Sequence, residues 1–360
     1  MLTLEEPTGA CNDRNRVADI AKGIGILSVV LGHVIAGLSA AGIAKNDSAW
    51  IGLNRWLYSW HMPLFVVLSG MFAHRLARKK ISEFATAQLF GIVLPYFFWG
   101  ILQTSIHVTL SSETNTHGTW TNIVDLLYNP PMQFWFLYFI FIAQNIYFVS
   151  SKLPCSGWFF TGISFALLLL LGLIQGQSTG VPNRVRENLP FYVVGTWLSP
   201  IFLSWGPIEF KAWRNQNDGN RPIYLTMIVG ACIITFLASV AISLSSLPNR
   251  ILWPWYLACS FPGVISILSI ANLLSRGTTI GDTLVFFGKN SLPIYLAHVI
   301  GYAGVRILLV RVMGVFDLTT HLAIGFFFGC FFPLAIVFGC EWLGLRVVPF
   351  FGNRALHHKR

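Results

Sequence analysis

The sequence predicts an all-α membrane protein, a polytopic helical bundle of about ten transmembrane helices with both termini in the cytoplasm. Hydrophobic residues make up 54% of the 360-residue chain and charged residues only 11%, with a mean hydropathy of +0.64. Soluble domains carry about 25% charged residues. The apolar runs are continuous and about 20 residues long, which is the length a helix needs to cross a bilayer. A membrane β-barrel would instead show short segments of alternating hydrophobicity.

Ten apolar ranges predict the helices in chain order. The sixth is short and is bounded by Pro190 and Pro200. We expect a cytoplasmic N-terminal segment at 1–16, a transmembrane domain at 17–346 and a cytoplasmic tail at 347–360. The ten ranges are 17–43, 51–73, 84–109, 132–149, 157–175, 189–204, 222–246, 251–275, 291–312 and 321–346.

The basic residues indicate the orientation of these helices. With the N-terminus placed in the cytoplasm, 17 of the 24 Lys and Arg residues fall on the inner side. This excess matches the positive-inside rule. The net charge of +10 therefore reflects topology, and we exclude nucleic acid as a partner. The seven basic residues on the outer side are Lys45, Arg55, Arg184, Arg186, Arg250, Arg306 and Arg311.

The first predicted helix carries two unusual polar residues. Lys22 and His33 lie on one helical face with Asp19, and they are 11 positions apart, or about 16 Å of helical rise. Lys22 alone is equally well explained as an interfacial anchor. His33 lies near mid-membrane, where an ionisable residue is costly and indicates function. A neutral imidazole is a natural general base near neutral pH.

The cysteines indicate neither a disulfide framework nor a metal site. Four of the six lie inside apolar runs, and their spacing matches no set of metal ligands. We therefore expect no metal.

Five motifs in order resemble the acyltransferase-3 family of membrane-bound O-acyltransferases. The similarity is closest to the branch of fucose 4-O-acetylase-like proteins, which includes exopolysaccharide and O-antigen acetylases, and it runs from about residue 14 to 346. The motifs are DIAKGIGILSVVLGH at 19–33, WHMPLFVVLSG at 60–70, HRLARKK at 74–80, QFWFLYF at 133–139 and GKNSLPIYLAH at 288–298.

The resemblance implies an integral plasma-membrane enzyme, in a bacterial inner membrane, with no bound cofactor. Its donor co-substrate would be cytoplasmic acyl-CoA, most often acetyl-CoA, with succinyl as an alternative acyl group. The acceptor would be a sugar hydroxyl on a cell-surface glycan or its lipid-linked precursor. An amino acid, a peptide or a small metabolite is the alternative acceptor. The other partners are membrane lipids.

The resemblance also assigns roles to residues of the first two helices. His33 carries over as the catalytic histidine, and Arg75 and Arg78 as a basic pair that would bind the phosphates of acyl-CoA together with Lys22. From sequence alone, a stop-transfer cluster explains the basic pair better. We expect His33 to deprotonate the acceptor for direct attack on the thioester, in preference to an acyl-histidine route. Supporting roles are expected for Asp19, Arg14 and Arg16.

Four further polar or aromatic residues are candidates to line the acceptor cavity. His61 precedes Pro63, which bends the second helix, and Tyr295 and His298 share a face of the ninth. Trp135 could stack on a sugar. Structural hydrogen bonds and an interfacial aromatic belt are the plainer explanations.

A transporter or flippase for a polar or lipid-linked solute is the main rival function. Buried histidines could couple transport to protons. Transporters of this kind show broken helices in matched halves, and this sequence shows no such duplication and few acidic residues inside its predicted helices.

Overall fold

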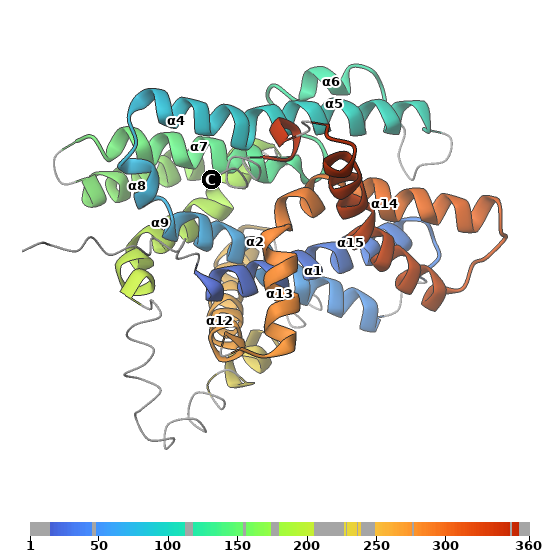
Figure 1. Cartoon of the computed structure of the whole chain (residues 1–360). Helices are drawn as coiled ribbons and strands as arrows, with labels where there is room; N and C mark the ends of the chain where they lie inside the picture. The colour runs from blue at the N-terminus through green and yellow to red at the C-terminus, as the bar shows by residue number, and fades with distance from the viewer. Residues whose placement is uncertain are drawn as a thin grey trace, which may run out of the picture.

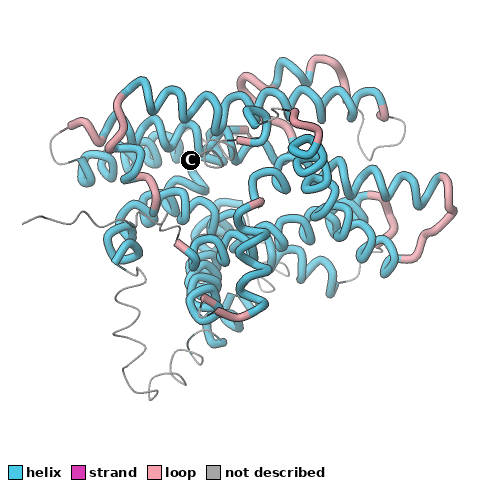
Figure 2. Tube along the Cα trace, in the orientation of Figure 1, coloured by secondary structure: helices cyan, strands magenta, loops and turns pink. Residues whose placement is uncertain are grey.

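The computed structural model describes most of the chain, and every regular element in the described residues is helical (Figure 2). The described residues are 15–44, 48–111, 118–153, 156–173, 180–204, 227, 229–235, 237–238, 249–275, 277–345 and 348–352.

Nine of the ten predicted ranges coincide with a helix in the described part of the chain, and the seventh, 222–246, lies mostly outside it. The elements are α1 Arg16–Ala40, α2 Ser48–Met71, α3 His74–Ala77, α4 Ile81–Gln88, a π-helix Leu89–Val93, α5 Leu94–Thr109, α6 Asn122–Asp125, a 3-10 turn Met132–Phe134, α7 Trp135–Ser150, α8 Ser156–Leu173, α9 Val181–Ser204, α12 Asn249–Leu274, α13 Thr279–Lys289, α14 Ser291–Arg311, α15 Leu318–Trp342 and a 3-10 turn Val348–Phe351.

Five helical stretches among the described residues are long and apolar enough to cross a membrane, which makes this a membrane protein in structure as in composition. Two further apolar helices, 157–171 and 259–274, are shorter. The total of ten crossings and the cytoplasmic placement of both termini stay predictions. The five stretches are Arg16–Ala40, Ile81–Thr109, Met132–Ser150, Ser291–Arg311 and Leu318–Trp342.

Polar side chains fix where several helices begin. The side chain of Asn15 accepts a hydrogen bond from the backbone of Ala18 at 3.1 Å and starts α1. Thr278 and Asp317 cap α13 and α15 in the same way. Each cap satisfies a backbone N–H that the first helical turn leaves without a partner.

Helix α1 lies at the centre of the bundle. It packs against α2, α12, α13, α14 and α15, and α14 and α15 lie side by side next to it (Figure 1). Two glycines let the backbones of α1 and α13 touch: a Cβ on Gly23 would overlap the carbonyl of Leu284, and one on Gly288 would overlap that of Asp19. Close approach through small residues is a general way of packing membrane helices.

Helices α2 and α9 also cross through a pair of glycines. A Cβ on Gly70 would overlap the carbonyl of Tyr192, and one on Gly195 would overlap that of Val67. Helix α9 is longer than the predicted range 189–204, since it begins at Val181 and continues through Pro190. The proline is tolerated because neighbouring helices can compensate for its lost hydrogen bond.

The beginning of the predicted tail returns to the bundle. Residues 348–351 form a 3-10 turn, and the carbonyl of Phe350 accepts a 2.8 Å hydrogen bond from the indole of Trp99 on α5. Phe351 packs beside the same indole, with ring centroids 5.1 Å apart. The packed part of the chain therefore extends past the predicted boundary at 346.

Candidate active site

Three histidines from three helices meet around the centre of α1. The ring of His33 on α1 lies edge-on to that of His298 on α14, with centroids 5.0 Å apart. The ring of Tyr58 on α2 contacts the rings of both His33 and His61, with centroids 5.9 Å and 4.7 Å apart. His61 and His298 are fully buried, whereas His33 keeps some accessible surface. His33 is therefore the residue with the most accessible surface among these three histidines.

One face of α2 lines this site. Asn54, Tyr58 and His61 follow one another at steps of four and three residues, so their side chains share a helical face. Asn54 Oδ1 lies against Gly32, next to His33, and has no hydrogen-bond partner among the described residues. The site thus presents a buried amide oxygen beside its most accessible imidazole.

Backbone carbonyls bind one nitrogen of each buried histidine. Nδ1 of His61 lies 2.5 Å from the carbonyl oxygen of Leu57. Nδ1 of His298 lies 2.8 Å from the carbonyl of Tyr295 and 3.1 Å from that of Ile294. The Nε2 atoms of both rings are buried without a partner in the described part of the chain. Buried polar atoms normally have a hydrogen-bond partner, so these two nitrogens are placed to accept from a further donor.

The predicted donor-binding cations converge at the other end of α1. Lys22 Nζ lies 5.3 Å from the ring centre of Phe72, and the guanidinium carbon of Arg75 lies 4.7 Å from the same ring. Arg78 is exposed nearby on the same short segment. The structure therefore brings Lys22 and Arg75 around one aromatic ring, a contact that the sequence did not predict.

His74 lies in this cationic region, outside the membrane-spanning segments. Partial burial lowers the pKa of His74, and the adjacent Arg75 and Arg78 lower it further. The imidazole is therefore neutral near pH 7. Its Nδ1 lies 3.0 Å from the hydroxyl of Ser199 on α9. The positive charge of this region comes from its lysine and arginine residues.

The supporting residues at the N-terminus of α1 are placed differently from each other. Arg16 is tied to the α13 segment, with a 2.7 Å ion pair to Asp282 and a 3.1 Å hydrogen bond to the carbonyl of Ser275. Asp19 is buried, and its backbone packs against Gly288. Arg14 lies outside the described residues.

Tyr295 belongs to a buried polar network beside the histidines. Its hydroxyl donates to the carbonyl of Gln133, and the amide of Gln133 donates to Gln103 at 2.9 Å. Gln103 in turn donates to the carbonyl of Leu296 on α14. The network ties α5, the 3-10 turn before α7 and α14 together, and so it holds the helix that carries His298.

Trp135 lies towards the predicted outer side of the site. The guanidinium of Arg184, near the start of α9, stacks on its indole with 4.8 Å from carbon to ring centre. Glu187 lies 3.8 Å from Arg184. Arg184 thereby joins Trp135 to the start of α9.

Sequence reasoning missed several of these residues. The signal for Asn54 and Tyr58 was present, since both lie on the helical face of His61. Helix α13 was also missed, although Thr278 and Asp282 are typical of a helix start. The polar link between Gln103 and Gln133 had no sequence signal, because the two residues are 30 positions apart.

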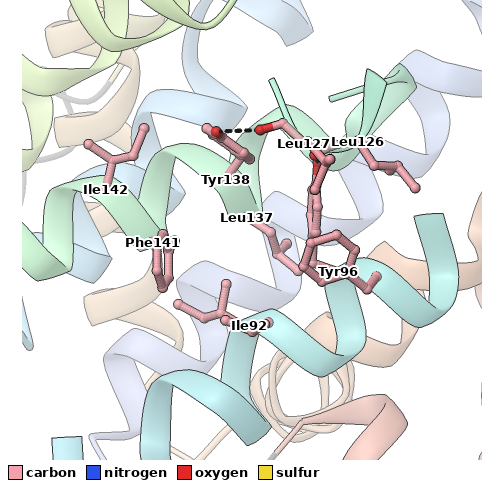
Figure 3. A pocket seen from close by; sticks show the side chains of 10 residues that line it. Ile92, Tyr96, Leu126, Leu127, Leu137, Tyr138, Phe141 and Ile142 are labelled. Carbon is pink, nitrogen blue, oxygen red and sulfur yellow. Dashed lines mark hydrogen bonds between the residues drawn. The ribbon is translucent and has the colours of Figure 1, made fainter. Parts of the chain in front are cut away.

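An apolar pocket lies between α5 and α7, and no histidine is among its lining residues (Figure 3). Its volume is about 270 Å³, and the π-helix at 89–93 contributes part of its wall. At one edge the hydroxyl of Tyr138 donates to the carbonyl of Leu127 at 2.9 Å. The lining is apolar apart from the hydroxyls of Tyr96 and Tyr138. Its lining residues are Ile92, Val93, Tyr96, Phe97, Leu126, Leu127, Leu137, Tyr138, Phe141 and Ile142.

Two curated proteins are similar to parts of this chain. Nodulation protein NolL of Mesorhizobium japonicum is 29% identical over 241 residues, which cover 64% of this chain and 58% of that protein. Nodulation protein NolL of Sinorhizobium fredii is 25% identical over 197 residues, covering 52% of this chain and 50% of that protein. The chain thus spans between half and three fifths of the relatives it matches. No solved structure shows significant similarity to it.

A family match covers most of the chain. Residues 15–342 match the acyltransferase-3 family, whose description is "Acyltransferase domain". The matched range begins one residue before α1 and ends with α15. The chain therefore belongs to the acyltransferase-3 family of membrane acyltransferases.

Proposed function

We propose that this protein transfers an acetyl group from cytoplasmic acetyl-CoA to a sugar hydroxyl of a cell-surface glycan or of its lipid-linked precursor. Membership of the acyltransferase-3 family supports the acyl transfer. The donor, the acceptor and the location in a bacterial inner membrane are the further steps of the proposal. Both curated relatives come from bacteria, which agrees with that location.

The observation that carries the proposal is the arrangement of charge along α1. Lys22 and Arg75 surround Phe72 at one end, and His33 meets His298 and Tyr58 eleven residues further along the same helix. That separation is about 16 Å of helical rise. Acetyl-CoA likewise has its charged groups and its reactive group far apart, with phosphates at one end and the thioester at the end of a long flexible arm.

The cationic end suits the phosphate groups of the donor. Arginine can bind phosphate oxygens through two parallel hydrogen bonds, and lysine adds a compact positive charge. Arg75 and Arg78 lie on the short segment that follows α2, at the predicted cytoplasmic surface. We expect the phosphates to displace Arg75 from the ring of Phe72, because a charge-assisted hydrogen bond is stronger than an exposed cation–π contact.

His33 supplies the base at the other end. It removes the proton from the acceptor hydroxyl as the oxygen attacks the thioester carbonyl carbon. A C–O bond forms, the C–S bond breaks, and the proton held by His33 passes to the departing thiolate. His33 is the one of the three histidines that is not fully buried as a residue, which supports its assignment as the base over His61 and His298.

Binding of acetyl-CoA to the purified, detergent-solubilised protein tests this division of roles. We expect saturable binding by the wild type, binding weakened about tenfold by Lys22→Ala, and binding unchanged by His33→Ala. A single lost charge-assisted contact of about 1.4 kcal/mol corresponds to that tenfold change.

Two results would count against the proposal. A folded wild-type protein that fails to bind acetyl-CoA would remove the donor, and solute flux in reconstituted vesicles would then test the transporter alternative. Equal loss of binding in Lys22→Ala and His33→Ala would place the phosphates and the chemistry at one location and contradict the separation along α1.

A further inference from the structure

We propose that His298 is a positioning residue that holds His33 in the tautomer required of a general base. The inference rests on the proposed acyl transfer. It assigns to His298 a role that acts through His33, without contact between His298 and the reacting atoms.

The backbone determines the protonation of His298. Its Nδ1 faces the carbonyl oxygens of Tyr295 and Ile294, at 2.8 and 3.1 Å. A carbonyl oxygen only accepts hydrogen bonds, so Nδ1 must carry the proton. In a neutral imidazole the other nitrogen, Nε2, then has a lone pair and can only accept.

That lone pair belongs to a fully buried ring and has no partner among the described residues. The nearest imidazole is His33, whose ring meets the ring of His298 edge-on at 5.0 Å and 62°. Hydrogen bonds of catalytic groups are often loose in a site without substrate and tighten when substrate binds. An N–H of His33 is therefore the donor that Nε2 of His298 is placed to accept.

This hydrogen bond settles which nitrogen of His33 acts as the base. If one nitrogen donates to His298, the other is unprotonated and can take the proton of the acceptor hydroxyl. When His33 takes the proton of the acceptor hydroxyl, the new imidazolium keeps the same hydrogen bond, now charge-assisted. His298 neither gains nor loses a proton in the cycle.

A neutral partner suits a site inside a membrane helix bundle. In soluble hydrolases a buried carboxylate performs this orienting task. A carboxylate at this depth would have to lose its hydration, which is costly. An imidazole with a fixed tautomer provides the same acceptor without a charge.

His61 has the same internal arrangement but a different neighbour. Its Nδ1 also binds a backbone carbonyl, that of Leu57, yet its ring contacts are with Tyr58 and Trp60. We therefore assign the positioning role to His298, whose ring touches that of His33.

The test measures CoA release from acetyl-CoA by membranes of cells producing each variant, with endogenous acceptor present and the acetyl-CoA concentration varied. His298→Leu removes the acceptor atom, whereas His298→Gln keeps an oxygen or nitrogen near the position of Nε2. His321 on α15 is the matched control, because it is also buried and bonded to a backbone carbonyl, at 2.9 Å from Val315.

We expect His298→Leu to lower kcat by at least a hundredfold with the KM for acetyl-CoA unchanged. His298→Gln should recover kcat to within about tenfold of wild type, which also shows that the fold tolerates the change. His321→Leu should stay within about twofold of wild type.

Three outcomes contradict the inference. Full activity of His298→Leu would show that His33 needs no such partner. A His298→Gln variant as inactive as His298→Leu, with equal thermal stability to wild type, would show that the imidazole has another role. Wild-type membranes that release no CoA above the background of cells lacking the protein would overturn the proposed acyl transfer, and this inference with it.

Discussion

At the scale of single residues, the structure separates two arginines that the sequence treats as a pair. Both side chains are exposed, but only Arg75 stacks on Phe72 together with Lys22 among the contacts of the described residues. A cation held beside Lys22 adds to one local positive field, whereas an exposed cation without such a contact is more readily screened by salt. Arg75 should therefore contribute more to donor binding than Arg78.

We predict that Arg75→Ala weakens acetyl-CoA binding about tenfold and that Arg78→Ala weakens it about threefold or less. Both losses of affinity should be smaller at high salt, which screens the charges. Isothermal titration of the purified variants at two salt concentrations measures both effects. If neither variant changes the affinity at low salt, the two arginines act only as the cytoplasmic flank of α2.

From sequence, the two ends of the candidate site could be proposed more readily than its middle. His33 and Lys22 could be proposed because an ionisable residue in an apolar helix is visible one residue at a time, and Arg75 could be proposed through the family resemblance. The contact between His33 and His298 could not, because the two residues are 265 positions apart and only the packing of α14 on α1 brings them together. Tyr295 is a candidate from sequence to line the acceptor cavity. In the structure its hydroxyl donates to the backbone carbonyl of Gln133.

At the scale of helices, pairs of glycines determine which helices approach most closely. Gly70 and Gly195 allow the backbones of α2 and α9 to touch, and this contact supports the end of α2 that leads to Phe72. Because the overlapping atoms are main-chain carbonyls, they cannot rotate away as a side chain would. A single added methyl group must push the helices apart.

We predict that Gly195→Ala destabilises the protein by about 1–3 kcal/mol, the usual cost of overpacking. Gly304 on α14 is the matched control because a Cβ there would meet nothing within 4 Å. Gly304→Ala should leave stability unchanged or raise it by up to about 1 kcal/mol. Thermal unfolding of the purified variants in one detergent compares them. Equal melting temperatures for the two variants would show that α2 and α9 separate easily.

Most helices could be predicted from hydrophobicity, but α13 could not be found in that way. Its 11 residues are too few to cross a bilayer, and only its caps mark it in the sequence. The structure shows that it packs on the first turns of α1 and that Asp282 pairs with Arg16. The predicted start of α9 at residue 189 is wrong, since the helix begins at Val181. Pro190 suggests a boundary in the sequence, although prolines also occur inside membrane helices.

At the scale of the whole molecule, the separation of donor and acceptor depends on the orientation of the bundle in the membrane. The predicted topology puts the cations around Phe72 at the cytoplasmic surface and the loop before α7 outside. Trp120 in that loop and Lys152 after α7 are both exposed, on predicted opposite sides.

We predict that Trp120→Cys, in a background without native cysteines, reacts with a membrane-impermeant maleimide in intact cells. Lys152→Cys should react only after the membrane is permeabilised. Labelling of both residues from the same side would contradict the predicted topology and with it the cytoplasmic position of the donor site.

Transfer of labelled acetyl groups from acetyl-CoA to membrane or surface glycans is the measurement that tests the central claim most directly. Membranes of cells that produce the wild type, His33→Ala or no protein are compared after base hydrolysis of the glycan fraction. We predict base-labile label with the wild type and a loss of at least a hundredfold with His33→Ala, although the variant still binds acetyl-CoA. Transfer by a folded His33→Ala at the wild-type rate would contradict the account, because the chemistry would then take place without the histidine at its centre.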